Sequence, residues 1–397
     1  MTSFTTPFST PVGMLSWTRV RIPRLVSTVA KCLYASTLLA VPFLLLDPEG
    51  LRGMQVIGFG MLGFSSLSSI LFLASYILGF THTAFPGSLQ VEGGALRVGN
   101  DRVVPLSEID GALVVERTAL GMTAPTVEIQ LVNGDRLTAR FSDPLMAKSL
   151  VDALGFGPRG RRVRMPLAAP MRRLLHLLYG GFAYVIAVVA MALATSAFDR
   201  GGGGAPWYAI FSSLQTVLLL GLYSLIRRLF EAPTVTVGHD GVRVERGFRT
   251  RFLPLRGLSR GLVGFLAVDG ARREALERLA AERAGPTMQP IERRAAFLRD
   301  AAPITEWRAR LAQVLVNASY RGAPVTADDA RTTLASAEAT PEERVGAALA
   351  LRASGEPPER IRVAAEAFAD PRLRVAVLAI ADGDDDRADD ALRKMVR

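Results

Sequence analysis

Four long apolar segments stand out in the pattern of hydrophobic and polar positions along the chain. Each has about 20 mostly apolar residues, the length that a helix needs to cross a hydrocarbon core of roughly 30 Å. The segments are residues 25–46, 54–80, 174–195 and 207–226. The pattern predicts a membrane α-helical fold, in which four transmembrane helices form two hairpins, residues 25–80 and 174–228, and the remaining parts are α+β.

Arginines flank these segments on one side only. The N-terminal segment 1–24 and the basic linker 156–173 are rich in arginine and contain no acidic residue, and Arg227 and Arg228 follow the last span. The connection within each hairpin holds a single arginine beside an acidic residue. Because Lys and Arg accumulate on the cytoplasmic side, we predict a multipass protein of the bacterial inner membrane with both termini in the cytoplasm.

Between the hairpins, residues 86–155 alternate between apolar and polar positions, which is typical of half-buried strands. Asn133 and Gly134 predict a two-residue hairpin turn. Asp143 is placed to cap a helix that has Pro144 in its first turn. An apolar stripe along this helix and a terminating Gly155 complete the pattern. We therefore expect six or seven short strands followed by one helix.

This order of strands and a helix resembles the bacterial pleckstrin-homology-like domains. The resemblance covers about 70 residues and includes no diagnostic motif. It implies a seven-stranded barrel or sandwich closed by a C-terminal helix, and a binding or scaffolding role. Related domains bind phosphoinositides through basic loops, but residues 86–155 contain nine acidic and six basic residues. Their charge does not favour a strongly anionic lipid ligand.

A second, partial copy of the β domain follows the second hairpin, at residues 232–268. The copies align by residue type, and the aligned pairs are Leu89 with Val235, Val91 with Val237, Arg97 with Arg243, Val98 with Val244, Pro105 with Pro254, Leu106 with Leu255 and Ile109 with Leu258. Residues 271–284 already have the composition of a helix, so too few strands remain for a complete barrel. We expect a truncated pleckstrin-homology-like module.

The C-terminal region, residues 271–397, has the composition of short stacked helices. Thr340 and Pro341 predict the start of one helix, and Asp370 and Pro371 predict the start of another thirty residues later. The repeated Pro, Arg-Val and small apolar positions weakly resemble the HEAT-like class of paired-helix repeats. A small helical bundle is the alternative. Either architecture offers a surface to a protein partner.

Two groups of residues are candidates for binding or packing. Basic residues of the linker and of the second module are candidates for contacts with anionic lipid headgroups, but membrane orientation for the linker and solvent-facing strand positions for the module are the favoured explanations. These residues are Arg159, Arg161, Arg162, Arg164, Arg243, Arg246, Arg249 and Arg251. Within the spans, Ser65, Ser69 and Gln215 predict close helix packing. The alternative for these polar residues is a transport pathway.

No residue set predicts a catalytic, cofactor-binding or metal site. The histidines His82, His176 and His239 have no carboxylate or thiol at metal-ligand spacing, and His239 is expected in a β turn. The only cysteine, Cys32, lies in the first apolar segment. No nucleophile and base occur in a recognisable pair. The chain is therefore predicted not to be an enzyme and to need no cofactor.

These observations predict a membrane-anchored binding or scaffolding module. Its expected partners are membrane lipids and a cytoplasmic protein. The net charge of +10 does not call for nucleic acid, because many arginines flank the apolar segments. A small-solute transporter or channel and a sensor of anionic lipid are the alternatives. The sequence does not fix the oligomeric state.

Overall fold

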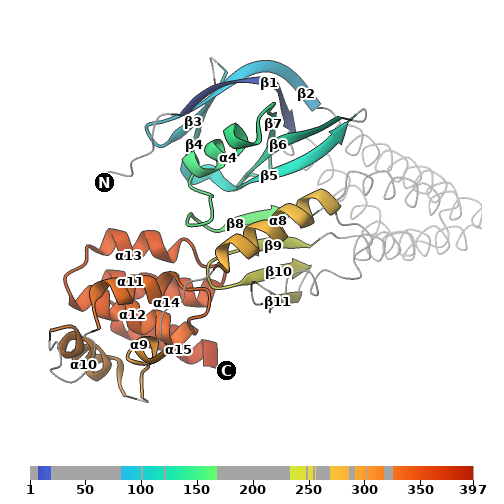
Figure 1. Cartoon of the computed structure of the whole chain (residues 1–397). Coiled ribbons are helices and arrows are strands. Elements are labelled where there is room, and N and C mark those ends of the chain that lie inside the picture. Colours follow the sequence, from blue (N-terminus) through green and yellow to red (C-terminus); the bar gives the residue numbers. More distant parts are fainter. Residues whose placement is uncertain are drawn as a thin grey trace, which may run out of the picture.

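The computed structural model describes two β modules and a helical region. The described residues are 8–18, 82–99, 102–119, 122–167, 233–246, 249–253, 255, 269–285, 291–300, 302–316 and 325–396. The four predicted spans, with Ser65, Ser69 and Gln215 among them, lie outside these residues, as do Cys32 and His176. Figure 1 shows the β modules beside a compact set of helices.

The prediction of a membrane α-helical fold is contradicted. Among the described residues no helix is long and apolar enough to cross a membrane. The longest of them, α8, has 14 residues, which extend over about 21 Å at 1.5 Å per residue, and half of its side chains are charged. The described fold consists instead of antiparallel sheets and short helices. The predictions of a multipass topology and of an inner-membrane location depended on that fold, and the same finding contradicts them.

The first module is a seven-stranded antiparallel sheet. Its strand order is β4-β3-β2-β1-β7-β6-β5. The strands are β1 (Phe8–Thr18), β2 (His82–Glu92), β3 (Ala95–Val98), β4 (Arg102–Pro105), β5 (Ile109–Ala119), β6 (Met122–Leu131) and β7 (Arg136–Arg140), with the 3-10 helix η1 (Leu106–Glu108) before β5. The central strand β1 comes from residues that the sequence pattern assigned to an N-terminal segment. Pro11, Gly13 and a shift of register between Val12 and Leu15 interrupt its alternation.

Helix α4 (Pro144–Ala153) closes this sheet as the sequence predicts. The Asp143 carboxylate accepts a hydrogen bond from the Leu145 N–H at 2.9 Å, which confirms the cap. The apolar stripe of α4 is buried against the sheet. The turn at Gly134 is longer than predicted, because residues 132–135 all separate β6 from β7. The Asn133 side chain stabilises it by accepting a hydrogen bond from the Asp135 N–H at 2.8 Å.

The second module is a four-stranded antiparallel sheet with the order β11-β10-β9-β8. Its strands are β8 (Val163–Pro166), β9 (Thr234–Val237), β10 (Val242–Arg246) and β11 (Arg249–Leu253). Val235 pairs with Val244 as Leu89 pairs with Val98, so the aligned residues occupy the same register positions in both sheets. The additional strand β8 comes from the predicted basic linker. It pairs with β9 in the way that β1 pairs with β2.

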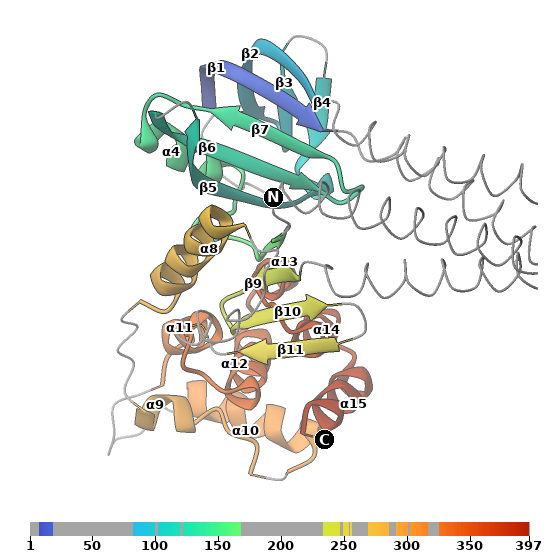
Figure 2. The ribbon, with the colours of Figure 1, turned by 90° about the vertical axis from the view of Figure 1, so that its right-hand side faces the viewer.

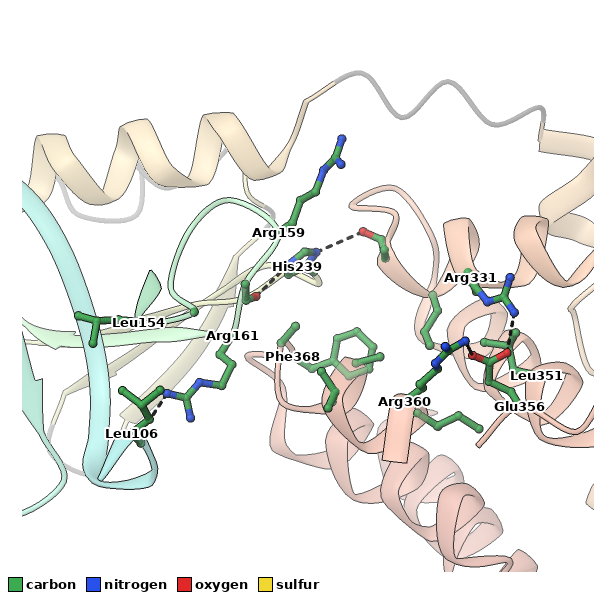
Figure 3. Close-up of a pocket in the computed structure, with 18 of the residues that line it drawn as sticks. Leu106, Leu154, Arg159, Arg161, His239, Arg331, Leu351, Glu356, Arg360 and Phe368 are labelled. Carbon is green, nitrogen blue, oxygen red and sulfur yellow. Dashed lines mark hydrogen bonds and ion pairs between the residues drawn. The ribbon is translucent and has the colours of Figure 1, made fainter. Parts of the chain in front are cut away.

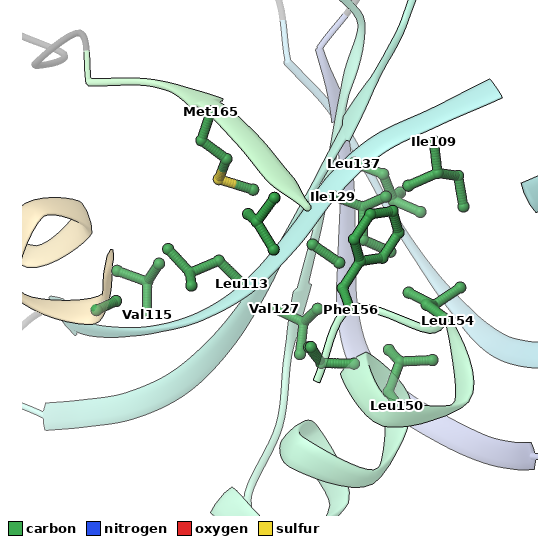
Figure 4. Close-up of a cluster of buried hydrophobic side chains, with 14 of the residues drawn as sticks. Ile109, Leu113, Val115, Val127, Ile129, Leu137, Leu150, Leu154, Phe156 and Met165 are labelled. Carbon is green, nitrogen blue, oxygen red and sulfur yellow. The ribbon is translucent and has the colours of Figure 1, made fainter. Parts of the chain in front are cut away.

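Helix α8 (Gly270–Arg283) packs against β5 and β9, so one hydrophobic core continues through both modules. Figure 4 shows Phe156 and Met165 beside the side chains of β5 and β6. Strands β5 and β8 approach closely at Gly111, where a Cβ atom would lie 2.8 Å from the Arg164 carbonyl oxygen. A residue larger than glycine at this position would push the two sheets apart.

A buried ionic network joins α8 to the first sheet. Arg272 Nε lies 2.5 Å from Glu128 Oε2, and Arg117 Nη2 lies 2.6 Å from both Glu128 Oε1 and Asp269 Oδ2. Glu128 and Arg272 are only 2% and 4% exposed. Burial favours the neutral form of Glu128, but the charges of Arg272 and Arg117 outweigh it and hold its pKa below the usual value.

The helical region packs around a second hydrophobic core (Figure 2). Its helices are α9 (Ile291–Ala295), α10 (Ile304–Val316), α11 (Ala327–Ala335), α12 (Pro341–Ala353), α13 (Pro358–Ala365), α14 (Pro371–Asp382) and α15 (Asp385–Val396). The predicted helix starts are confirmed: Thr340 and Glu343 form a capping box, and Asp370 caps α14. Helices α11 with α12, α13 with α14, and α14 with α15 are neighbours, as in stacked helical pairs.

Candidate functional site: a cleft between the β modules and the helices

A cleft of about 610 Å³ lies where the β modules meet helices α11, α12 and α13. Its walls are mostly apolar, and Figure 3 shows residues from both sides facing a common space. The apolar residues that form the walls include Leu106, Leu154, Leu334, Leu351, Ile361, Val363 and Phe368. Val363 is the most exposed of them, at 68%. Exposed apolar surface inside a cleft of this size is typical of a binding site.

The loop that follows α4 forms the β side of the cleft. Phe156 is buried in the core, and the guanidinium of Arg161 lies 4.7 Å from the centre of its ring. Arg161 Nη2 also donates a hydrogen bond to the Leu106 carbonyl oxygen at 3.0 Å. Burial lowers the pKa of Arg161. No described carboxylate forms an ion pair with it, so its charge is available to a ligand.

The helical side carries two arginines that share one carboxylate. Arg331 Nη2 lies 2.6 Å from Glu356 Oε2, and Arg360 Nη1 lies 3.0 Å from Glu356 Oε1. The hydrogen bond from Arg331 is the main reason why the pKa of Glu356 is lowered. Together with Arg159 and Arg161, four arginines and one glutamate line the cleft. Arg331 also forms an ion pair with Asp328, so the lining arginines keep an excess of two positive charges, which favours an anionic ligand.

The turn between β9 and β10 holds the helices against the β modules. Asp240 accepts hydrogen bonds from the N–H groups of Ala369 at 2.6 Å and Asp370 at 2.8 Å. The His239 N–H donates to the Ala367 carbonyl oxygen at 2.9 Å. At Gly238 a Cβ atom would lie 2.3 Å from the Ala369 nitrogen. The cleft is thus built on a tightly packed junction.

The imidazole of His239 lines the cleft between two carbonyl groups. Its Nε2 lies 3.2 Å from the Gly160 oxygen and its Nδ1 lies 3.4 Å from the Ala335 oxygen. Burial, together with the positive charge of Arg283, lowers the pKa of His239 from 6.5 to about 4, although both carbonyl groups favour the charged form. The ring is therefore neutral near pH 7, and it can donate to one of the carbonyls.

The structure distributes the eight arginines predicted to contact headgroups over three places. Arg159 and Arg161 line the cleft. Arg162 forms an ion pair with Glu366, and Arg164 and Arg243 both pair with Glu245. Arg246 ends β10, and Arg249 and Arg251 lie exposed on β11. The contact with lipid itself stays a prediction that no observation here tests.

Sequence reasoning missed the residues of the helical side. Arg331 comes from α11, Arg360 from α13, and Glu356 and Phe368 from the connections on either side of α13, all far along the chain from Arg161. Helix periodicity marks Ile361 and Phe368 only as apolar positions. The sequence placed His239 in a β turn, which the structure confirms, but gave no sign that this turn contacts the helices.

The described residues offer little that could hold a metal ion. Among them, no cluster of three or more His, Cys, Asp or Glu side chains could hold a metal ion. The charged groups of the cleft are arginines and a glutamate already paired with two of them. Comparisons with models of known families, with curated proteins and with solved structures find no match.

Proposed function

We propose that the chain is a non-enzymatic binding module that holds a segment of a protein partner in the cleft between the β modules and the helices. The segment combines apolar side chains with acidic ones. The observation that carries this proposal is the pairing of mostly apolar walls, with Val363 exposed, and an excess of two positive charges in one cleft of about 610 Å³. A purely apolar or a purely acidic ligand would satisfy only part of this surface.

The residues that line the cleft determine the expected free energy of binding. An apolar side chain that leaves water against the exposed Val363 contributes about 1.5–3 kcal/mol, and a carboxylate bonded to Arg161 contributes about 1.5–3 kcal/mol. The binding free energy is reduced by the cost of ordering the segment and by its loss of translational and rotational freedom. Two apolar contacts and one acidic contact contribute about 4.5–9 kcal/mol before these costs, so we expect a Kd weaker than about 1 μM.

A relationship of the first module to the bacterial pleckstrin-homology-like domains belongs to this proposal. Seven antiparallel strands followed by α4 support it. In this chain, however, the proposed site lies outside the seven-stranded sheet. The loop after α4 supplies one wall and helices of the C-terminal region supply the other. The β module would then position one half of a shared site.

A selection of binding peptides from a random display library, with the full chain as the bait, tests this function. We expect the enriched peptides to combine Leu, Ile or Phe with Asp or Glu. Arg159→Met and Arg161→Met should each weaken their binding about tenfold in fluorescence anisotropy, because each removes one charge-assisted contact.

Arg387→Met, which removes an exposed arginine of α15, is the matched control and should bind like the wild-type chain. Arg159 is exposed, so its replacement leaves the fold unchanged, and circular dichroism checks this. Selected peptides without acidic residues, or equal binding by the Arg159→Met, Arg161→Met and Arg387→Met variants, would show that the cleft is not the site.

A further inference from the structure

The helical wall of the cleft already contains a carboxylate. Glu356 lies between the guanidinium groups of Arg331 and Arg360, as Figure 3 shows. Arg331 Nη2 donates a hydrogen bond to Glu356 Oε2 at 2.6 Å, and Arg360 Nη1 donates one to Glu356 Oε1 at 3.0 Å. Both carboxylate oxygens thus accept a charge-assisted hydrogen bond. A carboxylate of a bound peptide would need the same donors.

The end of helix α12 fixes the position of Glu356. Gly355 has a φ of 85°, which glycine adopts without strain. The Gly355 N–H donates to the Arg352 carbonyl oxygen at 3.2 Å, and the Glu356 N–H donates to the Leu351 carbonyl oxygen at 3.0 Å. These two bonds form a Schellman motif. A pair of prolines follows and leads directly into α13. The backbone of Glu356 is therefore restricted from both sides.

The charges of the helical wall compensate one another. The side chain of Glu356 is 8% exposed, whereas those of Arg331 and Arg360 are 45% and 70% exposed. The hydrogen bond from Arg331 is the first cause that lowers the pKa of Glu356, which is therefore ionised near pH 7. Arg331 also forms an ion pair with Asp328. Two arginines and two carboxylates thus leave this wall without a net charge.

The β wall of the cleft differs in this respect. It carries Arg159 and Arg161, and among the described residues no carboxylate forms an ion pair with either of them. The excess of two positive charges therefore lies on the β wall. Exposed apolar surface lies opposite, at Val363 on α13. The cleft thus has a charged wall and an apolar wall that is electrically neutral.

We propose that Glu356 is a specificity-determining residue that occupies the carboxylate site of the helical wall. A bound segment then places its acidic side chains on the β wall and its apolar side chains on the helical wall. A ligand carboxylate directed at the helical wall would lose hydration beside the charge of Glu356 without gaining a free donor. Segments with acidic residues on one side are therefore favoured over segments with acidic residues on both. This inference rests on the proposed function and adds the orientation of the segment.

The variant Glu356→Gln tests this role. The amide keeps the shape of the side chain and removes its charge, so the two arginines become available to a ligand. The probes are a peptide selected by the wild-type chain and versions of it with one additional glutamate at each position in turn. We expect at least one added glutamate to make binding to Glu356→Gln about tenfold or more tighter than binding to the wild-type chain, measured by fluorescence anisotropy. Salt should reduce this gain.

Glu359→Gln provides the matched control. Glu359 lies in the first turn of α13, is 58% exposed, and pairs with Arg362 outside the cleft. This variant removes the same charge nearby and should bind every peptide like the wild-type chain. The inference is overturned if each added glutamate changes binding equally in Glu356→Gln, Glu359→Gln and the wild-type chain. It is also overturned if Glu356→Gln weakens all peptides alike, which would indicate a purely structural role.

The orientation of the peptide can be measured without changing Glu356. A benzophenone amino acid in place of Val363 should crosslink to the apolar residues of the selected peptide, and mass spectrometry locates the attachment. Crosslinks to its acidic residues instead would overturn the inference, even where the peptide binds in the cleft. A wild-type chain that selects no apolar and acidic peptide would contradict the proposed function itself, and this inference with it.

Discussion

Replacing Arg272 by methionine is expected to lower the free energy of unfolding by about 3–5 kcal/mol. The charges of Arg117, Arg272, Glu128 and Asp269 sum to zero; Arg272 and both carboxylates are buried, and the Arg117 side chain is 31% exposed. Without Arg272, one guanidinium must serve two buried carboxylates, so a negative charge remains uncompensated. Denaturant unfolding at pH 7 measures the loss.

A matched ion pair between the same two elements provides the control. Arg278 of α8 lies 2.7 Å from Glu116 of β5, but their side chains are 49% and 57% exposed. Arg278→Met should therefore cost less than about 1 kcal/mol. Adding Glu128→Gln to Arg272→Met should recover part of the stability, because it removes the uncompensated charge. Equal losses for the variants Arg272→Met and Arg278→Met would show that the buried network does not hold the modules together.

The stability of the chain is expected to fall by about 3 kcal/mol between pH 6.5 and pH 4 through His239 alone. The folded state lowers the pKa of this imidazole from 6.5 to about 4. In that interval the unfolded chain binds a proton that the folded chain does not, so acid favours unfolding. The contribution is fully present above pH 6.5, and it no longer changes below about pH 4.

Comparison with His239→Gln isolates this effect. Glutamine can donate to one of the two carbonyl groups that face the ring, and it does not titrate. The difference in unfolding free energy between the wild-type chain and the variant should shrink steadily as the pH falls from 6.5 to 4. Asp240, the neighbouring carboxyl, has its pKa raised by burial and titrates in both proteins, so its contribution largely cancels. A difference independent of pH would mean that the imidazole is not held neutral.

Local features of the structure could be predicted because neighbouring residues determine them. Asp143 and Thr340 cap the expected helices, since a short polar side chain before a helix has few alternative uses. The repeat was also readable, because Leu89 and Val235 must face a core in both copies. What could not be predicted was β1 in the centre of the first sheet. Its partner strand β2, His82–Glu92, lies beyond two of the apolar segments, and its own pattern is broken by Pro11.

The membrane fold shows a different limit of pattern reading. Counting apolar residues identifies segments that could cross a bilayer. It does not reveal that the strands before and after each predicted hairpin pair with one another, β1 with β2 and β8 with β9. These strand pairs belong to the two sheets of the described fold. The cleft could not be predicted either. Arg161 and Glu356 line the same cleft only because the turn at Gly238 packs on the helices.

The paired strands suggest how the two copies came to differ. In the first module β1 has β2 on one side and β7 on the other. In the second, β9 pairs with β8, and β8 ends the described sheet. There β8 lies against β5, where Gly111 allows the close approach, and α8 covers the shared core. The first module thus supplies the packing surface that strands β5 to β7 would supply in a complete second copy.

Photocrosslinking from the cleft tests whether a peptide that combines apolar and acidic residues binds there. A benzophenone amino acid in place of Val363 lies in the cleft, whereas the same group in place of Val103 lies on the edge strand β4; the native side chains are 68% and 61% exposed. The account predicts that a selected apolar and acidic peptide crosslinks at position 363 and not at 103, and that Arg161→Met reduces the yield. Equal crosslinking at both positions, or none at 363, would contradict it.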